Sequence, residues 1–257
     1  MLNHELNLQW IFSDKPILNK MPSQKVLIFD SSTLISFAMN GLLEEIRDLK
    51  SIFKGKFIVT EEVKEEIIYK PMNIRRFKLE ALQLKDLCDK GILEEPESLG
   101  ISKKDISKKT KELLEIANGI FDGDFYNEKR KVHLIDLGEA SCLALAQLIK
   151  EKSPQTEMII ATDERTTRML CEKPENLKEL LEKKLHIKIK FNKEGYEHFK
   201  GFNFLRSTEL IYVAYKKGLL NIKNSELLDA ALYAMRSKGA AVSDEEIKEI
   251  KLLDKKL

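Results

Sequence analysis

The chain has 257 residues, of which 43% are hydrophobic and 33% are charged, so it can bury a large core beneath an ionic surface. Its 44 basic and 42 acidic residues leave a net charge of +2. Any charged binding surface must therefore come from a local patch and not from the overall charge. No apolar run reaches membrane-spanning length and the N-terminus lacks a signal-peptide pattern, so we expect a cytoplasmic protein with no membrane partner. The three cysteines, Cys88, Cys142 and Cys171, are distant from one another and odd in number, so we expect reduced thiols.

The first strong element is the short apolar run over residues 26–29, which predicts a buried strand of a parallel sheet. Asp30 follows it directly, and Ser31 and Ser32 then introduce a helical pattern. Asp30 is therefore expected at the carboxyl end of a central strand. That edge is where open α/β sheets bind ligands.

Residues 56–59 predict the second strand, and the helix after it opens with acids. Glu62 and Glu66 are four residues apart and share one face of this helix, with Glu65 between them in sequence. Within the next region, residues 118–131 carry two Gly, two Asp and three aromatic residues and predict a loop.

An Ala-rich amphipathic helix is predicted after residue 135, with Asp136 and Glu139 at its start. The apolar run over residues 158–161 predicts another buried strand, which ends at Thr162 and Asp163. Residues 186–191 alternate and predict a peripheral strand. Three helices are then predicted over residues 206–217, 223–238 and 243–256.

Strands that alternate with helices predict an α/β fold with a mainly parallel central sheet and helices on both faces. Residues 1–24 are interpreted as an extension anchored by Trp10, Ile11 and Phe12. The α/β domain is expected over residues 25–201, with a helical insertion at about 70–131. Residues 202–257 are expected to form helices that pack on the same domain.

Acids follow each major predicted strand, and right-handed crossovers bring the carboxyl ends of parallel strands to one edge. Converging carboxylates need a cation, and oxygen ligands without histidine select Mg²⁺ or Mn²⁺. Such a metal supports phosphodiester hydrolysis. Each acid also has a structural interpretation: Asp30 and Asp163 as helix caps, Glu62 as a charge at a helix dipole, and Asp136 with Glu139 as a capping box.

In their order and context, four segments resemble the PIN-domain ribonucleases: FDSSTLI at 29–35, VTEEVKEEI at 59–67, DLGEASCLALA at 136–146 and ATDERTTR at 161–168. The resemblance covers about residues 25–255. It implies a PIN-like fold and a cytoplasmic, metal-dependent endoribonuclease. One departure is the third acid, Glu139, where many members have Asp.

The resemblance places the four catalytic acids at Asp30, Glu66, Glu139 and Asp163, with Glu62 or Glu65 as alternatives to Glu66. Asp30, Glu139 and Asp163 would hold the metal, and Glu66 would orient or deprotonate the attacking water. Supporting positions are Ser31, Ser32, Glu62, Asp136, Thr162 and Glu164.

RNA is the expected partner, and cations near the site would bind it. The candidates are Arg165, Arg168, Arg75 and Arg76, with the lysines of residues 103–111 extending the surface. Two other functions stay open: a PIN-like module that binds RNA or protein with little or no catalysis, and a toxin paired with an antitoxin. Homodimerisation and a processing-complex partner are further expectations.

Overall fold

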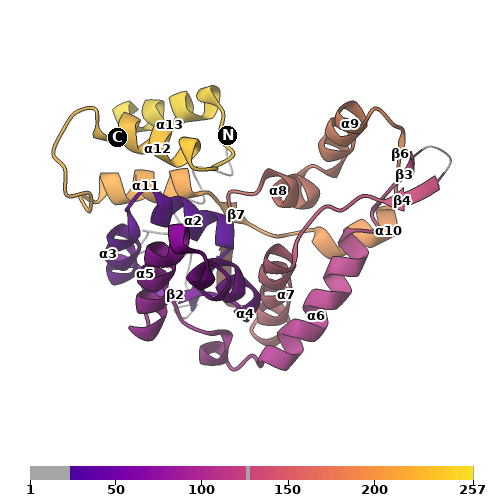
Figure 1. Ribbon diagram of the computed structural model, residues 1–257, viewed down its shortest axis with the longest axis horizontal. Helices are drawn as coiled ribbons and strands as arrows, with labels where there is room; N and C mark the ends of the chain where they lie inside the picture. The colour runs from indigo at the N-terminus through magenta and orange to yellow at the C-terminus, as the bar shows by residue number, and fades with distance from the viewer. Residues whose placement is uncertain (1–23, 126–127, 257) are drawn as a thin grey trace.

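The computed structural model describes residues 24–125 and 128–256, so the anchors Trp10, Ile11 and Phe12 lie outside the described residues (Figure 1). A parallel four-stranded sheet in the order β2-β1-β5-β7 forms its centre. This confirms the predicted α/β class. The strands are β1 (Lys25–Phe29), β2 (Gly55–Ile58), β5 (Glu157–Ala161) and β7 (Phe204–Leu205).

Strand β1 is central, and its residues 26–29 are completely buried. Burial of such side chains contributes about 1.5–3 kcal/mol each, against a total domain stability of about 5–15 kcal/mol. In the register, Phe29 lies opposite Ala161, and the Asp30 N–H donates to the Ala161 carbonyl at 2.9 Å. Asp30 and Thr162 therefore leave neighbouring strands at the same carboxyl edge.

Helices surround this sheet. The Ala-rich helix α7 buries most of its small side chains, and α6 lies beside it (Figure 1). The helices are α2 (Ser31–Met39), α3 (Leu43–Ile52), α4 (Glu61–Lys64), α5 (Lys78–Asp89), α6 (Lys103–Ala117), α7 (Leu137–Lys152), α8 (Arg165–Glu172), α9 (Pro174–Leu185), α10 (Lys193–Tyr196), α11 (Ser207–Lys216), α12 (Leu227–Ser237) and α13 (Asp244–Lys256). Short turns are η1 (Glu65–Tyr69), η2 (Pro71–Asn73), η3 (Arg75–Phe77), η4 (Pro96–Leu99) and η5 (Glu197–Phe199).

A second, antiparallel sheet has the order β4-β3-β6. It consists of β3 (Phe121–Phe125), β4 (Glu128–Lys131) and β6 (Ile189–Phe191). The loop predicted over residues 118–131 is therefore wrong. Strand β3 pairs with β6, whose residues lie 66–70 positions further along the chain, and the Phe121 and Phe191 rings meet with centroids 5.4 Å apart. That long-range pairing leaves no local pattern in the sequence.

The three helices predicted at the C-terminus are confirmed as α11, α12 and α13. Strand β7 precedes them and adds to the edge of the parallel sheet, and α11 contacts α2 and α3. Cys88, Cys142 and Cys171 form no disulfide. Within the described residues, no helix has both the length and the apolar composition needed to span a membrane.

Candidate functional site

Asp30 is buried at the end of β1, with 1% of its surface exposed. Its Oδ2 accepts hydrogen bonds from Ser32 Oγ at 2.6 Å and Thr162 Oγ1 at 2.8 Å. Its Oδ1 is also buried and has no hydrogen-bond partner in the described part of the chain. Although Asp30 directly precedes α2, its side chain makes no capping hydrogen bond to that helix. A role as a helix cap therefore does not explain this carboxylate.

The pKa of Asp30 is also shifted in a way that a helix-capping role does not explain. Burial raises the pKa of its carboxyl group, and the nearby negative charge of Glu66 raises it further, whereas the hydrogen bonds from Ser32 and Thr162 lower it. A buried carboxylate with one oxygen unpaired is unfavourable unless a positive charge compensates it. The charge that acts most strongly on Asp30 is therefore a second carboxylate, that of Glu66.

Glu139 lies on the first turn of α7, and its Oε2 accepts a hydrogen bond from Thr167 Oγ1 at 2.6 Å. The same oxygen accepts a longer bond, 3.3 Å, from the Asp136 N–H, and the predicted capping box of Asp136 and Glu139 is confirmed. Burial raises the pKa of Glu139 to about 8, and the charges of Asp30 and Glu164 add to this effect. Glu139 and Asp30 therefore belong to one electrostatically coupled group, which we call the acidic group.

Glu66 lies in η1, a π-helical turn closed by the Lys70 N–H donating to the Glu65 carbonyl at 3.0 Å. Such turns occur often at functional sites. The Glu66 carboxylate accepts a hydrogen bond from the Gly138 N–H at 3.2 Å, at the N-terminus of α7. It therefore lies against the helix that carries Glu139.

The two alternatives to Glu66 lie differently. Glu65 is exposed. Glu62 is half-buried, and burial together with the charges of Glu61 and Glu66 raises its pKa. Of these acids, the structure brings Glu66 into contact with the first turn of α7.

Asp163 is buried, and both of its carboxylate oxygens have protein partners. Oδ2 accepts a hydrogen bond from Ser36 Oγ at 2.7 Å, and Oδ1 accepts one from the Ser207 N–H at 2.8 Å. These bonds join the end of β5 to α2 and α11. Asp163 therefore has a structural role, but not the predicted one of a helix cap, because the N-cap of α8 is Glu164.

Glu164 is exposed, and its carboxyl group interacts electrostatically with those of the other acids. Partial burial raises its pKa, followed by the charges of Asp30 and Asp163. Two hydroxyl groups connect this turn to Asp30: Ser32 Oγ accepts from the Asp163 N–H at 3.0 Å, and Thr162 Oγ1 accepts from the Glu164 N–H at 3.1 Å. The turn that carries Glu164, which was predicted only as a supporting residue, is therefore connected to Asp30 through two hydroxyl groups.

The remaining predicted residues lie around this group. Asp136 is exposed and bonds the ring of His133 at 2.8 Å, and Ser31 is half-buried at the start of α2. Thr167 was missed at the sequence level, because a threonine on a helix carries no signal of the carboxylate that it contacts.

The candidate RNA-binding arginines differ in exposure. Arg165 is exposed beside Glu164, and Arg75 and Arg76 are exposed in η3. Arg168 is partly buried, its Nε has no hydrogen-bond partner among the described residues, and burial and the charge of Arg206 lower its pKa. Arg165, Arg75 and Arg76 are thus open to solvent, whereas Arg168 is not freely available.

The donor set fits a hard divalent cation in its chemistry. Among residues 24–125 and 128–256, no three Asp, Glu, His or Cys side chains lie close enough together to hold one metal ion. Mg²⁺, however, is commonly bound by one or two carboxylates, with waters and substrate phosphate completing its shell. The unpaired Asp30 Oδ1 and the raised pKa of Glu139 are consistent with that arrangement.

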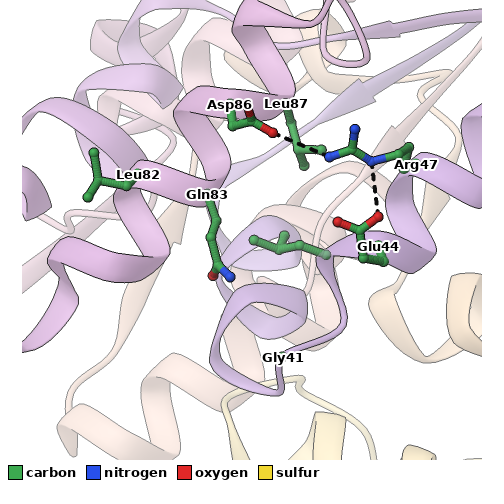
Figure 2. Close-up of a pocket in the computed structure, with 8 residues that line it drawn as sticks. Gly41, Glu44, Arg47, Leu82, Gln83, Asp86 and Leu87 are labelled. Carbon is green, nitrogen blue, oxygen red and sulfur yellow. Dashed lines mark hydrogen bonds and ion pairs between the residues drawn. The ribbon is translucent and has the colours of Figure 1, made fainter.

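Two surface cavities lie elsewhere. One of about 260 Å³ lies between α3 and α5, where Arg47 pairs with Glu44 at 3.1 Å and Asp86 at 3.4 Å (Figure 2). The other, of about 690 Å³, is lined by residues that include Lys150, Met158 and Phe202. Neither cavity is lined by a predicted catalytic or metal-binding residue, and the second is lined by Lys109, one of the lysines expected to extend the RNA surface.

Comparisons of the chain with protein-family models, with curated proteins and with solved structures found no match.

Proposed function

We propose that the chain is a metal-dependent endoribonuclease that hydrolyses RNA phosphodiester bonds at the carboxyl edge of β1 and β5. The observation that carries this proposal is the buried, unpaired Oδ1 of Asp30 beside Glu139, a carboxyl group with a pKa of about 8. Folding brings carboxyl groups together there that raise one another's pKa. A bound divalent metal would supply a positive charge that favours their ionised form.

In this proposal Asp30 and Glu139 hold Mg²⁺ or Mn²⁺, and Glu164 completes the acidic group. Asp163 remains a predicted ligand, but its two oxygens already have protein partners, which favours Glu164. When bound, such a metal polarises the phosphate and lowers the pKa of a coordinated water. The choice of RNA as substrate rests on the resemblance of the four motifs to PIN-domain ribonucleases.

The chain's own residues have distinct tasks. Ser32 and Thr162 hold Asp30, and Thr167 holds Glu139 through a 2.6 Å hydrogen bond. Glu66, fixed by the Gly138 N–H, orients the attacking water and accepts its proton. The Glu164 side chain, exposed next to Asp30, is available to waters and to substrate.

A second candidate is a binding module that holds RNA without cutting it. The lack of a three-ligand metal group among the described residues favours this alternative. The two candidates differ in whether the acids act on the RNA.

The test is cleavage of a mixed set of single-stranded and structured RNAs in Mn²⁺, in Mg²⁺ and in EDTA. We expect metal-dependent cutting that Asp30→Asn and Glu139→Gln abolish. Glu179→Gln, which removes an exposed carboxylate of α9, is the matched control and should cut normally. RNA that is bound but never cut in either metal would favour the binding module.

A further inference from the structure

A basic surface lies at the second sheet and was not indicated by the predicted arginines. Residues 183–193, KKLHIKIKFNK, contain five lysines and one histidine and no acid. We name the five lysines the basic edge: Lys183, Lys184, Lys188, Lys190 and Lys193. All five are exposed at the C-terminal end of α9, in and next to β6, and at the start of α10.

The geometry of β6 directs this charge outward. Ile189 is 3% exposed and the ring of Phe191 packs on Phe121, so these two residues face the protein. Side chains alternate along a strand, so Lys188 and Lys190 project from the opposite, solvent face. Strand β6 is also an edge of the described sheet, because it pairs with β3 alone.

Among the side chains that the structure describes, the five lysines of the basic edge make no ion pair, although Lys190 lies opposite Asp122 in the strand register. Lys64 and Lys103 both pair with Glu61 and Glu95, and Lys109 pairs with Glu112. The lysines expected to extend an RNA surface over residues 103–111 are thus partly neutralised by the described acids, and no described acid pairs with a lysine of the basic edge.

The basic edge lies within reach of Asp136, at the N-terminus of the helix that carries Glu139. Lys131, the last residue of β4, precedes Asp136 by five residues, which span at most about 18 Å. In the register, Lys131 lies opposite Asp122, and Asp122 lies opposite Lys190, so β6 is two strand spacings, about 10 Å, further on. The backbone at Lys190 is therefore within about 28 Å of Asp136, a length of roughly eight stacked nucleotides at 3.4 Å each.

We propose that the basic edge binds the phosphate backbone of a single-stranded RNA whose chain continues to the acidic group. The choice of RNA rests on the proposed function. Lysines on an edge strand also prevent pairing between sheets, which would account for Lys188 and Lys190. Prevention of edge pairing does not account for Lys183 and Lys184, which lie on a helix. An exposed row of cations within about 28 Å of Asp136 is accounted for by a polyanionic substrate.

The experiment measures binding apart from cleavage. A fluorescent 2′-O-methyl RNA of about 12 nucleotides resists hydrolysis and is titrated with the full chain in EDTA over a range of salt concentrations. The variant is Lys188→Gln/Lys190→Gln. The matched control is Lys223→Gln/Lys238→Gln, which removes the same charge from exposed positions near α12, on the other side of the molecule (Figure 1).

We expect the variant to raise the dissociation constant about tenfold at low salt. The slope of log K against log salt should fall by about 1.4, which corresponds to two lost phosphate contacts. The control should change neither value. Unchanged affinity and slope in the variant would overturn the proposal, as would displacement of the RNA by polyglutamate at equal charge, which would indicate an acidic protein partner. Cleavage of a short RNA that does not reach the basic edge reports on the nuclease separately.

Discussion

The Gly138 N–H donates a hydrogen bond to Glu66 Oε1 at 3.2 Å, and the absence of a side chain at Gly138 makes this contact possible. A Cβ added at Gly138 would lie 2.7–2.9 Å from three atoms of the Glu66 carboxyl group. Real carbon and oxygen atoms do not approach so closely. One of the two would have to move, and the end of the Glu66 side chain moves most easily.

Gly138→Ala is therefore expected to displace Glu66 and lower kcat at least tenfold, a loss comparable to that of Glu66→Gln. The helix itself should tolerate the change, because alanine is favoured over glycine in a helix by about 1 kcal/mol. Tm should remain the same or rise slightly. RNA cleavage rates and a thermal melt check both points, and full activity in Gly138→Ala would remove Glu66 from the mechanism.

Asp163 and Glu164 are adjacent in sequence but should respond differently to neutralisation. Asp163→Asn places an amide in contact with the Ser207 N–H or the Ser36 hydroxyl, and loss of one buried hydrogen bond costs about 1–3 kcal/mol. Glu164→Gln should leave the free energy of unfolding within about 0.5 kcal/mol of wild type while weakening metal binding. Urea denaturation and metal titration of both variants give the comparison. A stable Asp163→Asn protein that has lost its metal would restore Asp163 as the ligand.

Thr167→Val keeps the shape of the side chain and removes the 2.6 Å hydrogen bond to Glu139. Since that bond favours the ionised carboxylate, its loss should move the pKa of Glu139 above its value of about 8. Carbon-13 NMR titration of the metal-free protein measures this pKa directly. A pKa that stays the same would mean that Thr167 does not hold Glu139 in solution.

The metal-free protein should lose stability as the pH rises from about 4.5 to about 8. The Glu139 pKa is about 8 in the folded chain against an ordinary value of 4.5, so in this window the folded state binds more protons than the unfolded state. The free energy of unfolding therefore decreases with pH, and Asp30, whose pKa is also raised, acts in the same direction. Thermal melts in EDTA test this: Glu139→Gln should flatten the decrease, and Glu179→Gln should not. An equal decrease in all three proteins would assign it to other groups.

The sequence was sufficient for the strands that carry the site, because β1, β2 and β5 are short apolar runs followed by acids. It did not predict β7, which has two residues, or the pairing of β3 with β6, which depends on residues far along the chain. The partners of Asp163 were equally out of reach. Asp163 is held by Ser36 and Ser207, which lie more than 40 residues away in sequence on either side. The sequence near Asp163 and Glu164 therefore does not show which of these two carboxylates belongs to the acidic group.

The most direct test of the central claim is calorimetric titration of Mn²⁺ into the full chain at a pH near 8, where Glu139 is about half ionised without metal. Wild type and Glu179→Gln should bind Mn²⁺ with the same affinity, and Asp30→Asn and Glu139→Gln should each bind it at least tenfold more weakly. Wild-type affinity in Asp30→Asn, or no binding by the wild-type chain, would contradict a divalent cation at the carboxyl edge of β1.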